Sequence, residues 1–225
     1  MQKQKQDALG AIDALSPQLK ALADDIWEHP ECSLKERHAA ARYAEALEQL
    51  GFQVEQELGG IETAFCGSFG SGSPVIGILG EFDALSGLSQ AAGETAPRPL
   101  QPGGNGHGCG HNLLGVGALA AACAVKRYLE TSGASGTVIF FGCPGEEGGS
   151  GKAFLARVPA RGAPRIMPAE GAKVRVGPGR SSARPGSWPP APLTASPLVP
   201  ASSRAVLVLW PGAFRKTGGW GRAGC

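Results

Sequence analysis

The sequence predicts an α/β protein in which a largely parallel sheet is flanked by helices, and three observations carry this prediction. Strand-like apolar runs alternate with stretches of helical periodicity over residues 1–157, an order typical of parallel sheets with helical crossovers. Two runs, 74–82 and 137–144, are almost continuously apolar, as expected for strands buried on both faces. Acidic side chains follow closely after these two runs, and α/β folds place their functional sites at the carboxyl ends of such strands.

Two helices are predicted before the first strand. Apolar residues at helical spacing predict helical structure over 6–28. Pro17 either splits this segment into two helices or begins the second one. Ser33 followed by Glu36 has the pattern of a capping box and predicts the start of a second helix over 34–50. The later elements are predicted in this order: strands at 52–58, 63–70 and 74–82, a helix at 111–129, a strand at 137–144 and a helix within 145–157.

The character of the chain changes after residue 157. Residues 1–157 carry a net charge of −7, whereas residues 158–225 carry +9 and 11 of the 18 prolines. A proline-dense segment without apolar periodicity buries too little surface to offset its ordering entropy, so we expect a mostly disordered tail. Within it only 205–210 resembles a strand. The abrupt change suggests a joined foreign reading frame, such as an alternative exon or a retained intron.

Cysteine usage and hydropathy bear on the cellular compartment. The six cysteines form no CxxC pair and lie in apolar or glycine-rich surroundings, which favours reduced thiols and a cytoplasmic location. The N-terminus lacks the apolar core of a signal peptide. The longest apolar run, near 113–125, is too short to span a bilayer, so no membrane segment is predicted.

The segment GHGCGH at 106–111 holds the candidate metal ligands. Thiolate and imidazole groups bind borderline-soft divalent ions such as zinc, and the intervening glycines let the backbone approach an ion closely. Cys109 and His111 are the stronger candidates. His107 is either a third ligand or a loop histidine that hydrogen-bonds the backbone. His29 and His38 are interpreted as helix-end and helix-face residues.

Adjacent acids follow the strand at 137–144. Glu146 and Glu147 suit a site in which one carboxylate binds a metal and the other moves a proton. The alternative is a turn with two solvated acids before a helix N-terminus, where negative charge is favourable.

Two acids lie at the end of the strand at 74–82. Asp83 can orient a ligand imidazole, and the alternative is a loop or helix-capping aspartate. Glu81 is interpreted as an accessory acid or, by preference, as a plain solvated or loop residue.

Together these residues resemble the metal-dependent aminoacylase/carboxypeptidase family of metallopeptidases. The likeness narrows to its amidohydrolase branch and, within that, to dipeptidases that cleave β-alanyl-lysine. It is carried by four ordered pieces: IWEHPE at 26–31, GEFDALSGL at 80–88, GHGCGHNLLG at 106–115 and PGEEGGSGKAFL at 144–155. The resemblance implies that residues 1–157 are the N-terminal part of a zinc-peptidase-like catalytic domain. Residues 158–225 match nothing in the family.

The resemblance also implies a two-metal hydrolase that uses zinc or manganese. In this chain Cys109, His111 and Glu147 would be metal ligands, and Glu146 would be the general base that activates water. Asp83 would be the acid that orients the site. The implied substrate is a small dipeptide or acyl-amino acid, and the narrower likeness implies a basic C-terminal residue, as in β-alanyl-lysine.

The chain also departs from this family. The family supplies further histidine ligands downstream, whereas no histidine follows His111 here, and the family's lid and dimerisation segment is absent. We therefore expect a truncated hydrolase with impaired activity and a sheet that ends on an unpartnered strand. One alternative is an active enzyme with a sufficient site. Another is a non-enzymatic interaction protein whose basic tail binds acidic partners, without a motif for specific nucleic acid.

Overall fold

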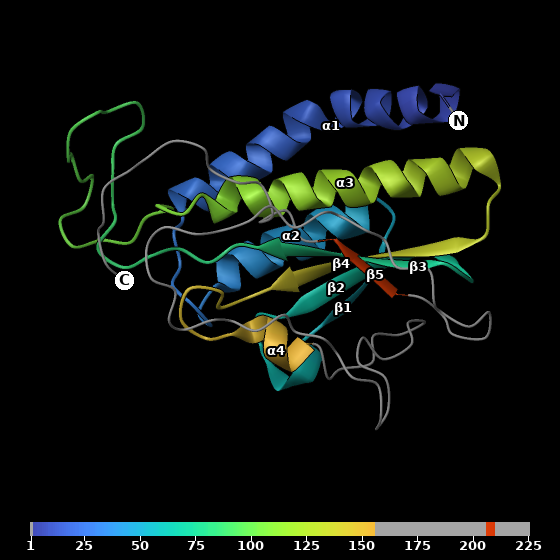
Figure 1. Cartoon of the computed structure of the whole chain (residues 1–225). Helices are drawn as coiled ribbons and strands as arrows, with labels where there is room; N and C mark the ends of the chain where they lie inside the picture. The colour runs from blue at the N-terminus through green and yellow to red at the C-terminus, as the bar shows by residue number, and fades with distance from the viewer. Residues whose placement is uncertain (1, 156–205, 210–225) are drawn as a thin grey trace, which may run out of the picture.

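The computed structural model describes residues 2–155 and 206–209, drawn in colour in Figure 1. The helices are α1 (Gln2–Glu28), α2 (Arg37–Gln49), α3 (His111–Ser132), α4 (Gly151–Leu155) and the 3-10 helix η1 (Leu58–Gly60). The strands are β1 (Gln53–Gln56), β2 (Phe65–Ser71), β3 (Val75–Glu81), β4 (Gly136–Cys143) and β5 (Val206–Leu209). None of the helices in these two ranges combines the length and apolarity that a bilayer crossing requires.

The strands form one sheet in the order β1-β2-β4-β3-β5. This confirms the α/β class with flanking helices, although the sheet is mixed rather than largely parallel. The β3–β4 and β3–β5 pairs are parallel, whereas β1–β2 and β2–β4 are antiparallel. The connection between β1 and β2 is short, which suits antiparallel neighbours, whereas α3 supplies the long crossover that parallel pairing of β3 with β4 requires.

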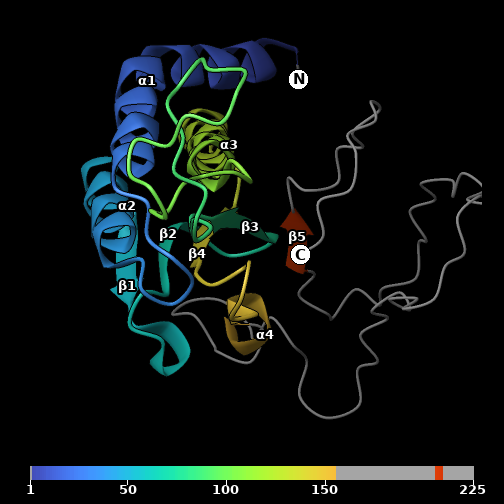
Figure 2. The ribbon, with the colours of Figure 1, turned by 90° about the vertical axis from the view of Figure 1, so that its left-hand side faces the viewer.

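Central strand β4 separates two apolar layers, and all its residues are buried. Val138 and Phe140 contribute to the core under α1, α2 and α3. Ile139 and Phe141 contribute to a smaller core on the other face, with η1 and α4. Figure 2 shows this layering, with α1 and α3 above the sheet and α4 below it. Because successive side chains of a strand point to opposite faces, both faces of β4 are covered and all its residues are buried.

Helices α1 and α3 lie side by side above the sheet (Figure 1). Helix α1 continues through Pro17, so the alternative of two separate helices is not realised. Beneath them Tyr43, Phe65, Phe82 and Phe140 form an aromatic cluster with ring centroids 5.5–6.1 Å apart. Phe82 immediately precedes Asp83, so this cluster anchors the chain just before the predicted site.

The predicted capping box at the start of α2 is wrong. Ser33 does not cap the helix, because its hydroxyl donates to Asp83 instead. The backbone N–H groups of His38 and Ala39 donate to the Glu31 carboxylate, each at 3.0 Å. Glu31 therefore satisfies the first turn of α2 from outside the helix.

Glu36 is buried and links three segments. Its carboxylate accepts hydrogen bonds from the Thr63 hydroxyl and from the N–H groups of Leu34 and Gly145. Burial nevertheless raises its pKa. Because Gly145 immediately precedes Glu146, Glu36 fixes the turn that follows β4.

Strand β5 pairs with the outer edge of β3, from Val75 opposite Val206 to Ile78 opposite Leu209. This pairing confirms the strand predicted within 205–210. It also contradicts the expectation of an unpartnered final strand as far as β3 is concerned, because β5 covers the outer edge of β3. The predicted boundary at 157/158 and the disorder of the other tail residues lie outside the described residues.

Candidate metal centre

The structure brings all five predicted site residues together at the carboxyl ends of β3 and β4. Asp83 lies just beyond β3, and Glu146 and Glu147 lie in the turn after β4. Cys109 is in the loop before α3, and His111 is the first residue of that helix. Because β3 and β4 are parallel neighbours, their carboxyl ends meet at one edge of the sheet.

His111 and Asp83 form the buried centre of this group. His111 Nδ1 lies 2.9 Å from Asp83 Oδ1 and 3.0 Å from the Asp83 backbone oxygen. Both neighbours of Nδ1 are acceptors, so Nδ1 carries the proton and Nε2 faces the other acids. Asp83 Oδ2 accepts from the Ser33 hydroxyl at 2.7 Å and from the Glu147 N–H at 2.9 Å. These contacts hold the His111 imidazole against Asp83, an arrangement that carboxylates supporting a metal-binding histidine commonly have.

Three carboxylates surround the free nitrogen of His111. Its Nε2 lies 3.3 Å from Glu81 Oε2 and 3.8 Å from both Glu146 Oε2 and Glu147 Oε1. Two ligand groups result, Cys109–His111–Glu147 and Glu81–His111–Glu146, each with its ligand atoms within 4.8 Å of one another. Both groups use the same imidazole, and one Nε2 lone pair binds one ion.

The electrostatic surroundings shift three pKa values. Burial would raise the pKa of Asp83, but hydrogen bonds from His111, Glu147 N–H and Ser33 lower it. Burial would lower the pKa of His111, but Asp83 and the nearby glutamates raise it. Burial and the neighbouring carboxylates raise the pKa of the Cys109 thiol to about 11. A divalent cation would reverse this last effect, because a coordinated thiol loses its proton.

The residues present fit a divalent metal ion. Glu147 Oε1 is buried and has no hydrogen-bond partner, as expected for an oxygen whose partner is an ion. The donor set combines a sulfur, an imidazole nitrogen and a carboxylate oxygen, which suits zinc. Within residues 2–155 and 206–209, Cys109, His111 and Glu147 are thus a group that could hold a metal ion.

Two glycines let the chain form the loop that carries Cys109. Gly110 has a φ of 82°, in the left-handed region, at the N-cap of α3. A Cβ added at Gly106 would lie 2.0 Å from the Leu88 backbone oxygen. The backbone conformation at Gly110 and the close approach of Leu88 to Gly106 therefore both favour glycine in this loop.

His107 does not join the ligand groups in the described part of the chain. It is buried, and its Nε2 lies 3.0 Å from the Ile26 backbone oxygen. Its ring stacks on Trp27 with centroids 6.4 Å apart. Of the two alternatives for His107, the structure supports the loop histidine that binds backbone.

Sequence reasoning did not assign Ser33 or Lys152 to the centre, and for Glu81 it preferred a solvated or loop role to that of an accessory acid. The preference for a solvated Glu81 is wrong, because this residue is 3% exposed and contacts both His111 and Lys152. Lys152 extends from α4 to the Glu81 carboxylate, and Ser33 reaches Asp83 from the α1–α2 connection. A signal for Glu81 was its position as the last residue of a strand buried on both faces. Ser33 is 50 residues from its partner, and no local pattern marks that contact.

The chain is similar in sequence to a known family and to known proteins. Residues 77–181 match the family described as peptidase family M20/M25/M40. The chain is 56% identical over 147 residues to one subunit of the p-aminobenzoyl-glutamate hydrolase of Escherichia coli (strain K12), covering 65% of this chain and 31% of that protein. It is 31% identical over 163 residues to Xaa-Arg dipeptidase of Mus musculus, covering 67% of this chain and 34% of that protein. The chain thus spans about a third of the length of these curated relatives.

A solved structure supports the fold. The chain is similar to the Bacillus subtilis YXEP protein, which is described as a dinuclear metal binding peptidase from the M20 family. The TM-score is 0.50 at 22% identity, and the match covers 65% of this chain and 38% of that one.

Proposed function

We propose that the chain, which matches peptidase family M20/M25/M40 over residues 77–181, carries part of a metal-dependent amide hydrolase centre. The observation that supports this most strongly is the environment of His111. Its Nδ1 is fixed by Asp83, and its Nε2 points toward three carboxylates. A histidine held this way is oriented as a metal ligand.

The ligands proposed for the ion are Cys109, His111 and Glu147. Cys109 contributes a thiolate, for which zinc is a better match than manganese. Glu147 is 20% exposed at its side chain, compared with 33% for Glu146. The more buried acid, whose Oε1 has no hydrogen-bond partner and lies 3.8 Å from His111 Nε2, is better placed as the ligand. The more exposed acid is better placed to meet water and substrate.

The residues would divide the reaction as follows. When bound, the ion supplies Lewis acidity to the scissile carbonyl and to the attacking water. Glu146 accepts a proton from that water as it attacks and returns the proton to the departing nitrogen. Asp83 holds the His111 tautomer throughout, with Ser33 and the Glu147 N–H stabilising its charge.

The number of ions is a separate part of the proposal. His111 is shared by both ligand groups, and no histidine follows it in the sequence. We therefore assign one ion to the described residues. A second ion would need donors beyond those that this region supplies.

The proposed substrate is an amide between an acyl group and an amino acid. The relative at 56% identity is named for p-aminobenzoyl-glutamate, whereas the relative at 31% is named for dipeptides that end in arginine. The higher identity favours an aminobenzoyl-amino acid as the first substrate to test. A dipeptide with a basic C-terminal residue, such as β-alanyl-lysine, is the alternative.

The test measures hydrolysis of p-aminobenzoyl-glutamate and of β-alanyl-lysine by the purified chain, with zinc or manganese added. Glu146→Gln is expected to abolish turnover while metal binding persists, since the amide cannot take the proton. Glu62→Gln is the matched control, because Glu62 is an exposed acid paired with Arg37. Turnover unchanged in Glu146→Gln would contradict the assigned base. Absence of turnover from a folded, metal-loaded chain would contradict activity of the chain by itself.

A further inference from the structure

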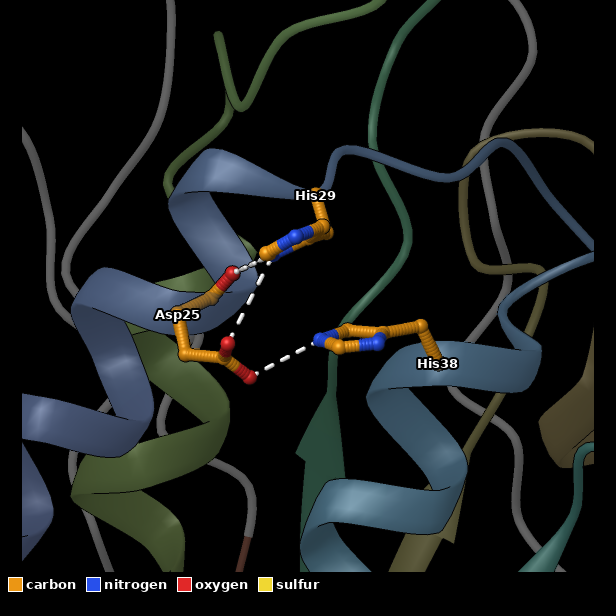
Figure 3. Close-up of side chains that lie close together, drawn as sticks. All are labelled: Asp25, His29 and His38. Atoms are coloured by element: carbon orange, nitrogen blue, oxygen red, sulfur yellow. Dashed lines mark hydrogen bonds and ion pairs between the residues drawn. The ribbon is translucent and has the colours of Figure 1, made fainter.

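A second cluster of metal-ligating side chains lies where α1 meets α2, and we call it the α1–α2 cluster. It consists of Asp25 in the last turn of α1, His29 just after that helix, and His38 in the first turn of α2. Figure 3 shows the two imidazoles approaching the Asp25 carboxylate from different elements. The cluster shares no residue with the centre at His111. We propose that these three side chains form a second divalent-metal site, of the zinc, nickel or copper class, which joins α1 to α2.

The ligand atoms have the spacing that such an ion needs. Two ligand atoms bound to a tetrahedral zinc at 2.0–2.1 Å lie about 3.3 Å apart. His38 Nε2 is 2.9 Å from Asp25 Oδ2, and His29 Nδ1 is 3.5 Å from Asp25 Oδ1. Counting one ligand atom from each of the three residues, these atoms lie within 4.8 Å of one another. The cluster thus needs little rearrangement to surround an ion.

The two imidazole rings of the cluster lie close to each other. Their centroids are 4.2 Å apart, with an angle of 32° between the planes. A neutral imidazole offers one nitrogen lone pair, which is the form in which a histidine binds a metal. An imidazole–imidazole–carboxylate set suits zinc, nickel and copper better than magnesium or calcium.

Metal binding would leave no acceptor without a partner. His29 Nδ1 lies 2.8 Å from the Asp25 backbone oxygen, and binding would shift the ring proton to Nε2. That oxygen keeps the backbone N–H of His29 at 3.2 Å. His38 would likewise move its proton to Nδ1, and Asp25 Oδ2 keeps Arg42 Nε at 3.1 Å. The hydrogen bonds lost to the ion therefore have replacements.

The surroundings contain one element that opposes a cation. Arg42 is paired with Asp25 and with Glu45, and its positive charge lies beside the proposed ion. The side chains of His29 and His38 are 51% and 36% exposed, so an ion can enter from solvent and keep water as further ligands. Removal of Arg42 should therefore strengthen metal binding, whereas removal of either histidine should weaken it.

The experiment is a zinc titration of the full chain by calorimetry, with melting temperature measured with and without zinc. The variants are His29→Gln and His38→Gln, with Arg42→Gln as the matched control from the same cluster. Each histidine variant should lose one zinc-binding event, or bind it at least about tenfold more weakly, since outer-shell partners already contribute 10–100-fold. Both should also lose part of the zinc-dependent rise in melting temperature. Arg42→Gln should bind zinc as tightly as the parent chain or more tightly.

Two results would overturn this proposal. One is unchanged zinc stoichiometry and affinity in both histidine variants. The other is a loss in Arg42→Gln as large as in His38→Gln, which would mean that the cluster is only an ion-pair network. Because the centre at His111 is intact in every variant, its own zinc binding serves as the internal reference. If zinc fails to bind only at the His111 centre, the result would count against the proposed hydrolase centre and not against the α1–α2 cluster.

Discussion

The same contact occurs twice in this molecule, and its environment differs. His111 Nδ1 and His38 Nε2 each lie 2.9 Å from an aspartate oxygen, on Asp83 and Asp25. The first pair is buried, with side-chain exposures of 2% and 0%, whereas the second has 36% and 27%. A buried ion pair is costly to break because one charge is left without solvent or partner, whereas an exposed pair contributes little. Although the two nitrogen–oxygen distances are equal, breaking the buried pair should therefore cost more stability than breaking the exposed pair.

The partners of the two aspartates sharpen this contrast. Asp83 accepts from Ser33 and from the Glu147 backbone as well as from His111, so the chain commits three donors to one carboxylate. Asp25 is shared by His38 and Arg42 at a surface that solvent reaches. We infer that the Asp83 site positions a functional histidine, and that the Asp25 site is an accessible pair of helix-end ligands.

The largest effect is expected for Asp83→Asn. The amide can still accept from His111, but its NH₂ group would face the Glu147 N–H, so two donors would meet. We expect a loss of about 3 kcal/mol in the free energy of unfolding and a loss of about 10–100-fold in metal affinity. Chemical denaturation and metal titration would measure both. A variant as stable as the parent chain, with equal metal affinity, would show that the buried Asp83–His111 pair contributes nothing measurable to stability or to metal binding.

A glycine pair on α3 tests whether the buried centre depends on the packing of that helix. A Cβ at Gly115 would lie 2.3 Å from both the Glu81 backbone oxygen and Tyr43 Oη, whereas a Cβ at Gly117 meets nothing within 4 Å. Gly115→Ala should cost about 2 kcal/mol and weaken metal binding at His111. Gly117→Ala should stabilise by about 0.5–1 kcal/mol through helix propensity. Equal effects at the two positions, measured by thermal unfolding, would contradict the close approach of α3 to β3.

The pH dependence of stability in the metal-free chain tests the buried pair directly. The raised pKa of His111, above its ordinary 6.5, gives stability that is present below pH 6.5 and is lost as pH rises through the folded-state value. The lowered pKa of Asp83, below its ordinary 3.8, gives stability that is present above pH 3.8 and is lost as pH falls through the folded-state value. The pair should therefore stabilise most between these limits.

Denaturation in chelator across this range would measure that profile. His111→Asn should remove the decline on the alkaline side. Added zinc should reverse the decline, because a ligand imidazole must be deprotonated. An alkaline decline that persists in His111→Asn would assign it to another group.

The smallest effect is expected for Asp25→Asn in the absence of metal. The exposed contacts to His38 and Arg42 contribute little, so the loss should be about 0.5 kcal/mol. The same denaturation assay as for Asp83→Asn gives a direct comparison. A cost equal to that of Asp83→Asn would show that exposure does not separate the two pairs.

Local patterns in the sequence were sufficient to predict that the candidate site residues lie near one another. Asp83, Glu146 and Glu147 follow buried apolar strands, and Cys109 with His111 lies at a glycine-rich helix start. Side chains placed this way converge wherever adjacent strands run parallel, so their approach follows from short-range signals.

What the sequence did not reveal depends on tertiary packing. Ser33 fits the sequence pattern of a capping box, but its hydroxyl donates instead to Asp83, which is 50 residues away in the sequence. Glu81 lies at a position where solvation is common, but α3 and Lys152 cover it. The α1–α2 cluster arises because two helix ends meet, and His29 and His38 share no periodic pattern. The antiparallel β1–β2 pair follows from a short connection, whereas β2 and β4 pair antiparallel although β3 and α3 lie between them in the sequence.

The measurement that most directly tests the central claim is cobalt(II) titration of the purified chain, monitored by thiolate-to-cobalt charge-transfer absorption. Ligation by Cys109 and His111 predicts this absorption in the parent chain and in His38→Gln, and its loss in Cys109→Ser and His111→Asn. Absorption that persists in Cys109→Ser, or that is absent from the folded parent chain, would contradict a metal centre at this edge of the sheet.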